Sequence, residues 1–261
     1  MSGPVIRPAR PLTGAITVAL GALVVLALAP LVVRAGADVW RAPAVLPQRW
    51  GTRGLEITLD SGALPALGRS VTVAVVTTAI ALVLAWPAAR VLGERRLRHP
   101  AAIFLLLAMP LLVAPYAVGT GLTEWFLRLG LAGSLAGLIL AHLAVVLPYA
   151  VLLLLSGFGP ELRRLEEMSR ASGLAPAQRL RWVTLPALRP TLAAAALLSF
   201  LVSWSQYGTS LAVAPTQPTL PVVLLPFVGR DPQTAAALSL LFLAPALLAL
   251  VLAVRAVRPV A

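Results

Sequence analysis

Long runs without a charged residue divide this chain into apolar segments. No Asp, Glu, Lys or Arg occurs in residues 11–33, 70–89, 100–123, 129–160, 190–229 and 232–254. A helix needs about 20 apolar residues to cross the hydrocarbon core of a bilayer, so four of these runs fit one helix each. The two longest runs contain the Gly- and Pro-punctuated stretches SGFGP and APTQPTLP, and each fits one helix plus a connection.

The pattern therefore predicts an all-α membrane protein in which one domain, residues 1–261, holds six transmembrane helices. Their expected ranges are 11–33, 70–92, 100–120, 134–156, 190–211 and 234–254, and residues 157–189 form the long loop between the fourth and the fifth. Composition agrees, because 59% of the residues are hydrophobic and 11% are charged, against about 45–50% and 25% in soluble domains.

The 21 basic residues predict an orientation. An even number of spans puts both termini on one side of the membrane, and arginines gather in the cytoplasmic loops. Fourteen fall on the side of the termini: Arg7, Arg10, Arg90, Arg95, Arg96, Arg98, Arg163, Arg164, Arg170, Arg179, Arg181, Arg189, Arg255 and Arg258. Seven fall on the other side: Arg34, Arg41, Arg49, Arg53, Arg69, Arg128 and Arg230. We expect a multi-pass protein of the cell (inner) membrane with both termini in the cytoplasm.

The same distribution accounts for the net charge of +12, since the arginines flank apolar spans instead of forming one solvated face. We therefore expect no nucleic-acid partner. All the basic residues are Arg, so the chain lacks the lysine of a phosphate-binding P-loop. It has no Cys and two histidines, His99 and His142. These absences exclude ATP hydrolysis by a P-loop and a Cys-based metal site, and two histidines are too few for a His-rich one, so we expect no metal site.

Residues 166–190, EEMSRASGLAPAQRLRWVTLPALRP, carry six charged side chains between two apolar segments. The pattern predicts a short helix from Pro160 to about residue 172, with Leu162, Leu165, Met168 and Ala171 on one stripe. Gly173 is expected to end it in a left-handed conformation. Pro176 is expected to open a second helix, which Pro186 and Pro190 close before the fifth span. On these features alone the segment fits an amphipathic helix at the membrane surface.

The spacing within this segment resembles the EAA signature of permeases in type I ATP-binding-cassette (ABC) importers. That signature is E-A-A, three residues, G, nine residues and I-x-L-P. Here Glu167-Met168-Ser169 is followed after three residues by Gly173, and after nine more by the stretch VTLP of residues 183–186. Two departures exist: Met and Ser replace the paired Ala, and Ser172 stands where Asp usually precedes the Gly.

The resemblance implies the type I ABC importer permease fold and a non-catalytic transport subunit of the binding-protein-dependent inner-membrane family. It implies as partners two ATP-binding subunits, a second permease that is homologous or identical, and an extracytoplasmic substrate-binding protein. ATP and Mg would be used by the partner ATPase, so this chain would have no catalytic residues and would bind no cofactor itself. The 157–189 segment would be the cytoplasmic coupling loop, and its ATPase-coupling residues would be Glu166, Glu167, Met168, Ser169, Arg170, Ala171, Gly173 and Leu174.

Polar residues also gather in the expected fifth span, in SFLVSWSQYGTS at 199–210. Polar side chains at membrane depth line a path or join helices through hydrogen bonds. We take Ser203, Gln206 and Tyr207 as candidates for the translocation pathway, with helix–helix hydrogen bonding as the alternative. His142 lies in the fourth span without an acidic partner in any span, so we expect it to hydrogen-bond a neighbouring helix and not to relay protons.

Two other functions remain open. An ion-gradient-driven secondary transporter would be expected to carry intramembrane acidic residues, and the charge-free runs oppose it. An intramembrane hydrolase would need a nucleophilic serine motif paired with a histidine, which the sequence does not supply. The SWSQY stretch of residues 203–207 resembles the importer branch that handles thiamine, ferric iron, polyamines and sulfate, and this is the substrate class we expect.

Overall fold

The computed structural model describes residues 10–41, 43–93 and 100–257, and the chain within them divides into two compact units. One unit comprises residues up to Ser61 together with Leu224–Leu241, and the other comprises Gly62–Val223 together with the chain from Phe242 onward. Several arginines of the orientation argument lie outside the described residues, namely Arg7, Arg95, Arg96, Arg98 and Arg258.

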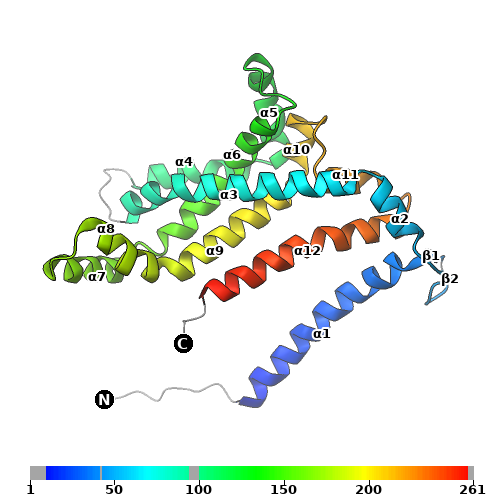
Figure 1. Ribbon diagram of the computed structural model, residues 1–261, viewed down its shortest axis with the longest axis horizontal. Helices are drawn as coiled ribbons and strands as arrows, with labels where there is room; N and C mark the ends of the chain where they lie inside the picture. Colours follow the sequence, from blue (N-terminus) through cyan, green and yellow to red (C-terminus); the bar gives the residue numbers. More distant parts are fainter. Residues whose placement is uncertain (1–9, 42, 94–99, 258–261) are drawn as a thin grey trace. The chain divides into compact units, whose positions relative to one another are not determined.

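Three long helices form the centre of the larger unit: α3 (Ala63–Gly93), α6 (Leu135–Leu155) and α9 (Leu185–Trp204). They lie side by side in Figure 1 and pack on one another pairwise. Small residues make this possible, because Ala81, Ala85 and Ala89 repeat every fourth position of α3 and are fully buried. Without large side chains between them the helix backbones approach closely, which is how helices associate in membranes. Leu154 and Leu188 fill the same core from α6 and α9.

The range 100–120, expected to hold one span, contains a sharply bent pair of helices. α4 (Pro100–Leu112) and α5 (Pro115–Arg128) meet at an angle of 102°. Pro115 lacks a backbone N–H and occupies the first turn of α5, so the helical hydrogen bonds stop before it. α5 packs against α10 (Gly208–Val213), a short helix that follows the end of α9.

The charged segment folds as expected in its first half and differently in its second. α7 (Pro160–Ala171) begins at Pro160, and α8 (Pro176–Arg179) begins at Pro176. The prediction that Pro186 and Pro190 close this second helix is wrong, since α8, the π-helix η1 (Leu180–Thr184) and α9 form one continuous helix from Pro176 to Trp204. The N–H of Leu185 bonds the carbonyl of Leu180, five residues back. This wider turn accommodates Pro186, which has no N–H to donate.

The predicted apolar stripe of α7 is also only partly inward. Leu162 is buried, whereas Leu165 and Met168 are exposed. The inward face instead carries Leu162, Glu166 and Ser169, which lie at helical spacing. Period-three counting missed this face because an ion pair between Glu166 and Arg90, not apolar burial, holds the middle of the helix.

The smaller unit contains α1 (Arg10–Ala35), a ribbon of two short strands, α2 (Arg53–Asp60) and the first part of α12 (Pro232–Val257). The strands β1 (Ala37–Val39) and β2 (Arg49–Trp50) pair antiparallel, so an otherwise helical fold includes a small sheet that the all-α prediction lacked. Ala35, Ala236 and Ala237 form its buried cluster. The 3₁₀-turn η2 (Leu225–Phe227) of this unit precedes α12, whereas α11 (Leu220–Leu224) before it lies almost wholly in the larger unit.

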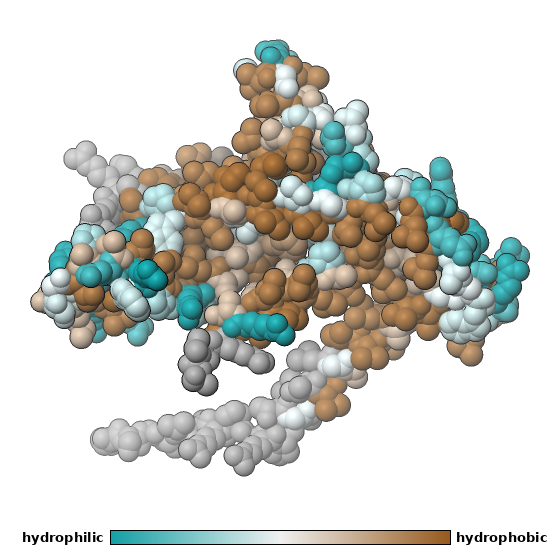
Figure 2. Space-filling view, in the orientation of Figure 1, coloured by the Kyte–Doolittle hydropathy of each residue, from teal (hydrophilic) through white to brown (hydrophobic). Residues whose placement is uncertain are grey.

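Four helices of the described chain are long and apolar enough to cross a membrane, and five if the bent α4–α5 pair counts as one span. In Figure 2 the hydrophobic colouring covers the surface of the larger unit's long helices, and hydrophilic residues gather where Figure 1 places α7 and α8. Exposed leucines and valines along α3 and α12 agree with this. Such a surface suits lipid as its solvent. The chain is therefore an α-helical membrane protein.

Candidate functional site

The charged segment is joined to the bundle through Glu166. One carboxylate oxygen of Glu166 accepts a bond from the Arg90 guanidinium of α3 at 2.9 Å, and the other accepts the Thr184 hydroxyl at 2.7 Å. Thr184 is buried at the end of η1, and the Glu166 side chain is largely buried. Three elements, α3, α7 and η1, therefore meet at one carboxylate. Since both of its oxygens are occupied, Glu166 fixes the position of α7 on the bundle.

The neighbouring Glu167 faces away from this contact and is exposed. Met168 beside it leaves 67% of its surface uncovered, and Arg170 is exposed as well. Ser169 turns inward and donates its hydroxyl to the Glu166 carbonyl at 2.8 Å. The eight residues predicted for ATPase coupling thus separate into an inward pair, Glu166 and Ser169, and an outward group.

Gly173 ends α7 with a φ of +80°, the left-handed conformation expected from the sequence. Its N–H bonds the Arg170 carbonyl, and the N–H of Leu174 bonds the Ser169 carbonyl. These two bonds form a Schellman motif, in which glycine is favoured because it has no Cβ to clash at positive φ. The turn after α7 is therefore fixed by backbone hydrogen bonds.

A second polar cluster lies inside the bundle around His142 of α6. Its Nδ1 lies 2.9 Å from the Ser203 hydroxyl of α9, and its Nε2 lies 2.9 Å from the Ser210 hydroxyl of α10. Ser210 uses its only hydrogen to bond the Gln206 carbonyl at 2.7 Å, so toward the ring it must accept. In the neutral imidazole, Nε2 therefore carries the proton and Nδ1 accepts from Ser203. The expected helix–helix role of His142 is confirmed.

This cluster surrounds a break in the helix of residues 185–213. α9 ends at Trp204, and α10 begins at Gly208, although the sequence predicted one span through residue 211. The hydroxyl of Thr209 lies within bonding distance of both the Gln206 side-chain oxygen and the Pro115 carbonyl, at 2.9 and 3.0 Å. Side-chain hydroxyls of α10 thus bond Gln206 at the break and Pro115 at the start of α5.

The three candidate pathway residues differ in exposure. In this chain Ser203 is 3% exposed and Gln206 is 6% exposed, whereas Tyr207 is half-buried. Ser203 bonds His142 of α6, Gln206 bonds Thr209 and Ser210 of α10, and Tyr207 is the most accessible of the three candidates.

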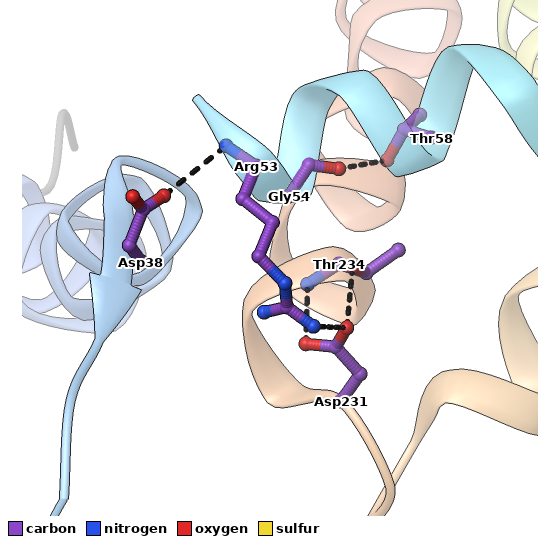
Figure 3. A network of polar contacts seen from close by, with 6 residues as sticks. All are labelled: Asp38, Arg53, Gly54, Thr58, Asp231 and Thr234. Atoms are coloured by element: carbon purple, nitrogen blue, oxygen red, sulfur yellow. Dashed lines mark hydrogen bonds and ion pairs between the residues drawn. The ribbon is translucent and has the colours of Figure 1, made fainter. Parts of the chain in front are cut away.

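The smaller unit has its own polar cluster, drawn in Figure 3. The guanidinium of Arg53 bonds the Asp231 carboxylate at 2.6 Å, and the backbone N–H of Arg53 bonds Asp38 at 3.2 Å. Thr234 donates its hydroxyl to Asp231 at 2.9 Å. Burial alone would raise the pKa of Asp231, but the bonds from Thr234 and the charge of Arg53 hold that pKa below its usual value. Asp231 thus caps the start of α12 and anchors α2 to it.

Gly54, in the first turn of α2, lies directly over that capped turn. A Cβ at this position would stand 3.1 Å from the backbone of Gln233, which is tighter than an ordinary van der Waals contact. The absence of a side chain therefore lets α2 approach the start of α12, and the Thr58 hydroxyl bonds the Gly54 carbonyl within α2 at 2.7 Å.

Sequence reasoning identified the charged segment but missed the residues that hold it. In the sequence, Arg90 stands out only as one of the arginines that set the orientation, and Thr184 only as part of the stretch VTLP. A signal existed in the sequence, because Arg90 directly follows the charge-free run 70–89 and Glu166 lies in the charged segment that follows the run 129–160. No group of three or more His, Asp or Glu residues in the described part of the chain could hold a metal ion.

No protein-family model matches the chain. The molybdenum transport system permease protein ModB of Mycobacterium tuberculosis is 32% identical over 211 residues, which is 75% of this chain and 80% of the relative. The trehalose transport system permease protein SugB of the same species is 31% identical over 171 residues, or 64% of this chain and 61% of the relative. The crystal structure of a bacterial ABC transporter that imports the acidic polysaccharide alginate has a chain with the same fold (TM-score 0.68, 16% identity, covering 98% of this chain and all of that one).

The helical bundle and these relatives define a membrane transport component without catalytic activity of its own. The chain belongs to the ABC transporter permeases, the binding-protein-dependent transport inner-membrane components. Membership implies an ATPase and a binding protein as partners, and permeases of this family bind no cofactor themselves. It is a multi-pass protein of a membrane.

Proposed function

We propose that this chain is the permease subunit of a type I ABC importer, forming half of the translocation pathway and coupling to the ATPase through residues 157–189. The observation that carries the proposal is the construction of α7. Glu166 fixes the helix to the bundle, the Gly173 motif fixes its end, and Glu167 and Met168 remain exposed for a partner. A helix held in this way transmits a partner's motion as a rigid body.

We propose six spans with both termini in the cytoplasm, inside one permease domain of residues 1–261. The four long helices and the bent α4–α5 pair account for five, and α1, whose apolar stretch covers Gly21–Ala35, accounts for the sixth. The arginine distribution supports the orientation. The membrane would be the cell (inner) membrane.

The complete importer would contain two ATP-binding subunits, which use ATP and Mg, a second permease that is homologous or identical, and an extracytoplasmic binding protein. No nucleic acid is expected. A groove of about 360 Å³ in the smaller unit supports the external partner, since arginines outnumber aspartates along it. Its arginines are Arg34, Arg41, Arg53 and Arg230, and its aspartates are Asp38 and Asp231. Such a surface attracts an acidic one.

We propose that the break between α9 and α10 borders the translocation pathway, with Tyr207 as the accessible side chain and Ser203 and Gln206 as its support. Irregular backbone at membrane depth is tolerated only where protein buries it or water reaches it. A Tyr207→Cys variant tests this, because the chain has no cysteine. A membrane-impermeant thiol reagent should modify the thiol introduced at position 207 and block transport, whereas Leu252→Cys, an exposed apolar position of α12, should not react.

The SWSQY stretch indicates the importer branch for thiamine, iron, polyamines and sulfate. Within that branch we propose a tetrahedral oxyanion such as sulfate as the substrate. ModB is named as a molybdenum transport permease and SugB as a trehalose transport permease. The alignment with this chain covers 80% of ModB and 61% of SugB. Molybdate and sulfate are both tetrahedral oxyanions, so this relative favours that end of the group. Uptake assays with labelled sulfate and molybdate, against thiamine, would test the choice.

The coupling proposal is tested by two variants, Gly173→Val and Glu167→Ala. A β-branched residue at a φ of +80° is strained by about 1–3 kcal/mol, so the end of α7 should shift. We expect less ATPase to co-purify with either variant and less ATP hydrolysis to be stimulated by substrate, while the permease still inserts.

Matched controls lie away from the segment. Gly130, in the turn after α5, has a φ of +69° with open space around a Cβ, so Gly130→Val imposes the same strain elsewhere. Glu124→Ala removes an exposed carboxylate of α5. If both segment variants kept normal ATPase association, or the controls lost it equally, α7 would be a surface helix and not the coupling element.

A further inference from the structure

A small pocket lies behind α7, on the side of the Glu166 contact. Its volume is about 120 Å³, and its walls include Arg90 of α3, Glu166 and Arg170 of α7, Arg179 of α8 and Thr184 of η1. Three guanidinium groups thus converge on a single space with one carboxylate. The walls carry a net charge of about +2, given the fixed protonation of arginine.

The carboxylate in this pocket is already committed. Both oxygens of Glu166 accept bonds, from Arg90 and from Thr184. Arg170, one helical turn after Glu166, makes no ion pair with it among the described residues. Glu166 therefore neutralises Arg90 and does not neutralise the charges of Arg170 and Arg179.

Arg179 carries an unsatisfied hydrogen-bond donor. Its Nε is buried and has no hydrogen-bond partner within the described chain. Leaving such a donor buried and unpaired is unfavourable, and more so for a charged group. The Arg179 side chain also lines the pocket, so an anion bound there would be attracted by its guanidinium charge.

We propose that this pocket binds a small tetrahedral oxyanion of the phosphate type. The arginines come from three elements and therefore approach from different directions. A tetrahedral anion offers acceptor oxygens in all of these directions, whereas a planar carboxylate offers two. Guanidinium forks also match phosphate geometry. The bound anion would tie α8 and the end of α7 to α3, next to the Glu166 contact. The site is measurable on the permease alone, so its presence does not depend on the proposed coupling role.

The test uses the purified full chain in nanodiscs of phosphatidylcholine, titrated with inorganic phosphate at constant ionic strength. We expect a saturable rise of the melting temperature and one site by calorimetry, because a ligand of the folded state stabilises it by mass action. Arg179→Gln and Arg170→Gln should each weaken phosphate binding by about tenfold or more. Arg179→Lys, which keeps the charge but not the fork, should fall between these variants and the parent.

The control is Arg164→Gln, which removes an exposed arginine of α7 that does not line the pocket. Its affinity for phosphate should equal the parent's. Equal weakening in this control would indicate diffuse attraction and overturn the proposal, as would the lack of saturable binding in the parent. If acetate competed as well as phosphate, the pocket would be built for a partner's carboxylate and the proposal would also fail.

Phosphate can be free or part of a lipid headgroup. Repeating the titration in phosphatidylglycerol nanodiscs distinguishes the two sources. An unchanged affinity supports free phosphate as the occupant. Weaker phosphate binding in phosphatidylglycerol, with no such dependence left in Arg179→Gln, supports a headgroup phosphate at the same site.

Discussion

Glu166 and Thr184 lie 18 residues apart and are joined by a hydrogen bond of 2.7 Å that connects α7 to the π-helix before α9. The acceptor is a carboxylate that also receives Arg90, so the bond is charge-assisted. This contact positions the proposed coupling helix on the bundle, and it can be tested without any partner subunit.

The first prediction concerns that bond. Thr184→Val keeps the side-chain shape but removes the hydroxyl, and should loosen α7 by about 1–2 kcal/mol. Amide hydrogen exchange of residues 160–171 should become faster, while exchange in α6 stays unchanged. Thr184→Ser should restore the parent rate. Ser172→Ala, which removes a hydroxyl bonded only to the nearby Met168 carbonyl, is the local control. Equal exchange in Thr184→Val and the parent would show that the bond does not hold the helix.

The second prediction is the tautomer of His142. Because Ser210 donates to the Gln206 carbonyl, the imidazole should carry its proton on Nε2. Nitrogen NMR distinguishes the two tautomers, and a His99→Gln variant leaves His142 as the only histidine. A proton on Nδ1 would contradict this direction of the hydrogen bonds around the ring.

The same hydrogen bond between His142 and Ser210 should contribute to the free energy of unfolding. Ser210→Ala leaves the buried Nε2–H unpaired and should cost about 1–3 kcal/mol. Ser156→Ala is a control, since that exposed hydroxyl bonds only the nearby Leu153 carbonyl. Similar unfolding free energies for the two variants would argue against the network.

The third prediction is a pH dependence in the smaller unit. The pKa of Asp231 is lowered in the folded state, so its contribution to stability is present above the unfolded pKa of about 3.8 and is lost as the pH falls through the lower folded value. Asp231→Asn should therefore destabilise the protein by about 1 kcal/mol at pH 7, and this cost should shrink as the pH falls below 3.8. Asp60→Asn, at an exposed position, is the matched control. A cost that did not shrink at low pH would exclude the bonds from Thr234 and the charge of Arg53 as its cause.

The fourth prediction is topological. Val45, in the smaller unit, is 86% exposed, and Val45→Cys should be labelled by an impermeant thiol reagent from outside the cell. Ser172→Cys, beside Gly173, should be labelled only after the membrane is permeabilised. The chain has no other cysteine, so each signal is unambiguous. Labelling at position 45 only from the cytoplasm would reverse the proposed orientation.

Features that depend on local chain chemistry could be predicted from the sequence. Pro160 and Pro176 open helices because proline suits a first turn, and Gly173 takes a positive φ because the chain must turn there. The spacing around Gly173 also identified the family. These features need few long-range contacts.

Features that depend on residues far apart in the chain could not be predicted from the sequence. The inward face of α7 follows from Arg90, which lies 76 residues before Glu166. The break after Trp204 follows from packing of α10 on α5, and nothing between residues 204 and 208 except Gly208 disfavours a helix. Pro186 gave the opposite error: it predicted a helix end, but the π-turn before it lets the helix continue.

That π-turn sets the rotation of the α9 side chains about the helix axis, relative to those of α8. The five-residue turn at Leu180–Thr184 contains one residue more than an α-helical path would. One residue corresponds to about 100° around a helix axis. Deleting a residue there would therefore rotate Ser199 and Ser203 by about a quarter-turn relative to α8, with no change in their chemistry. The one extra residue of the π-helix therefore determines which way the side chains of α9 face relative to those of α8.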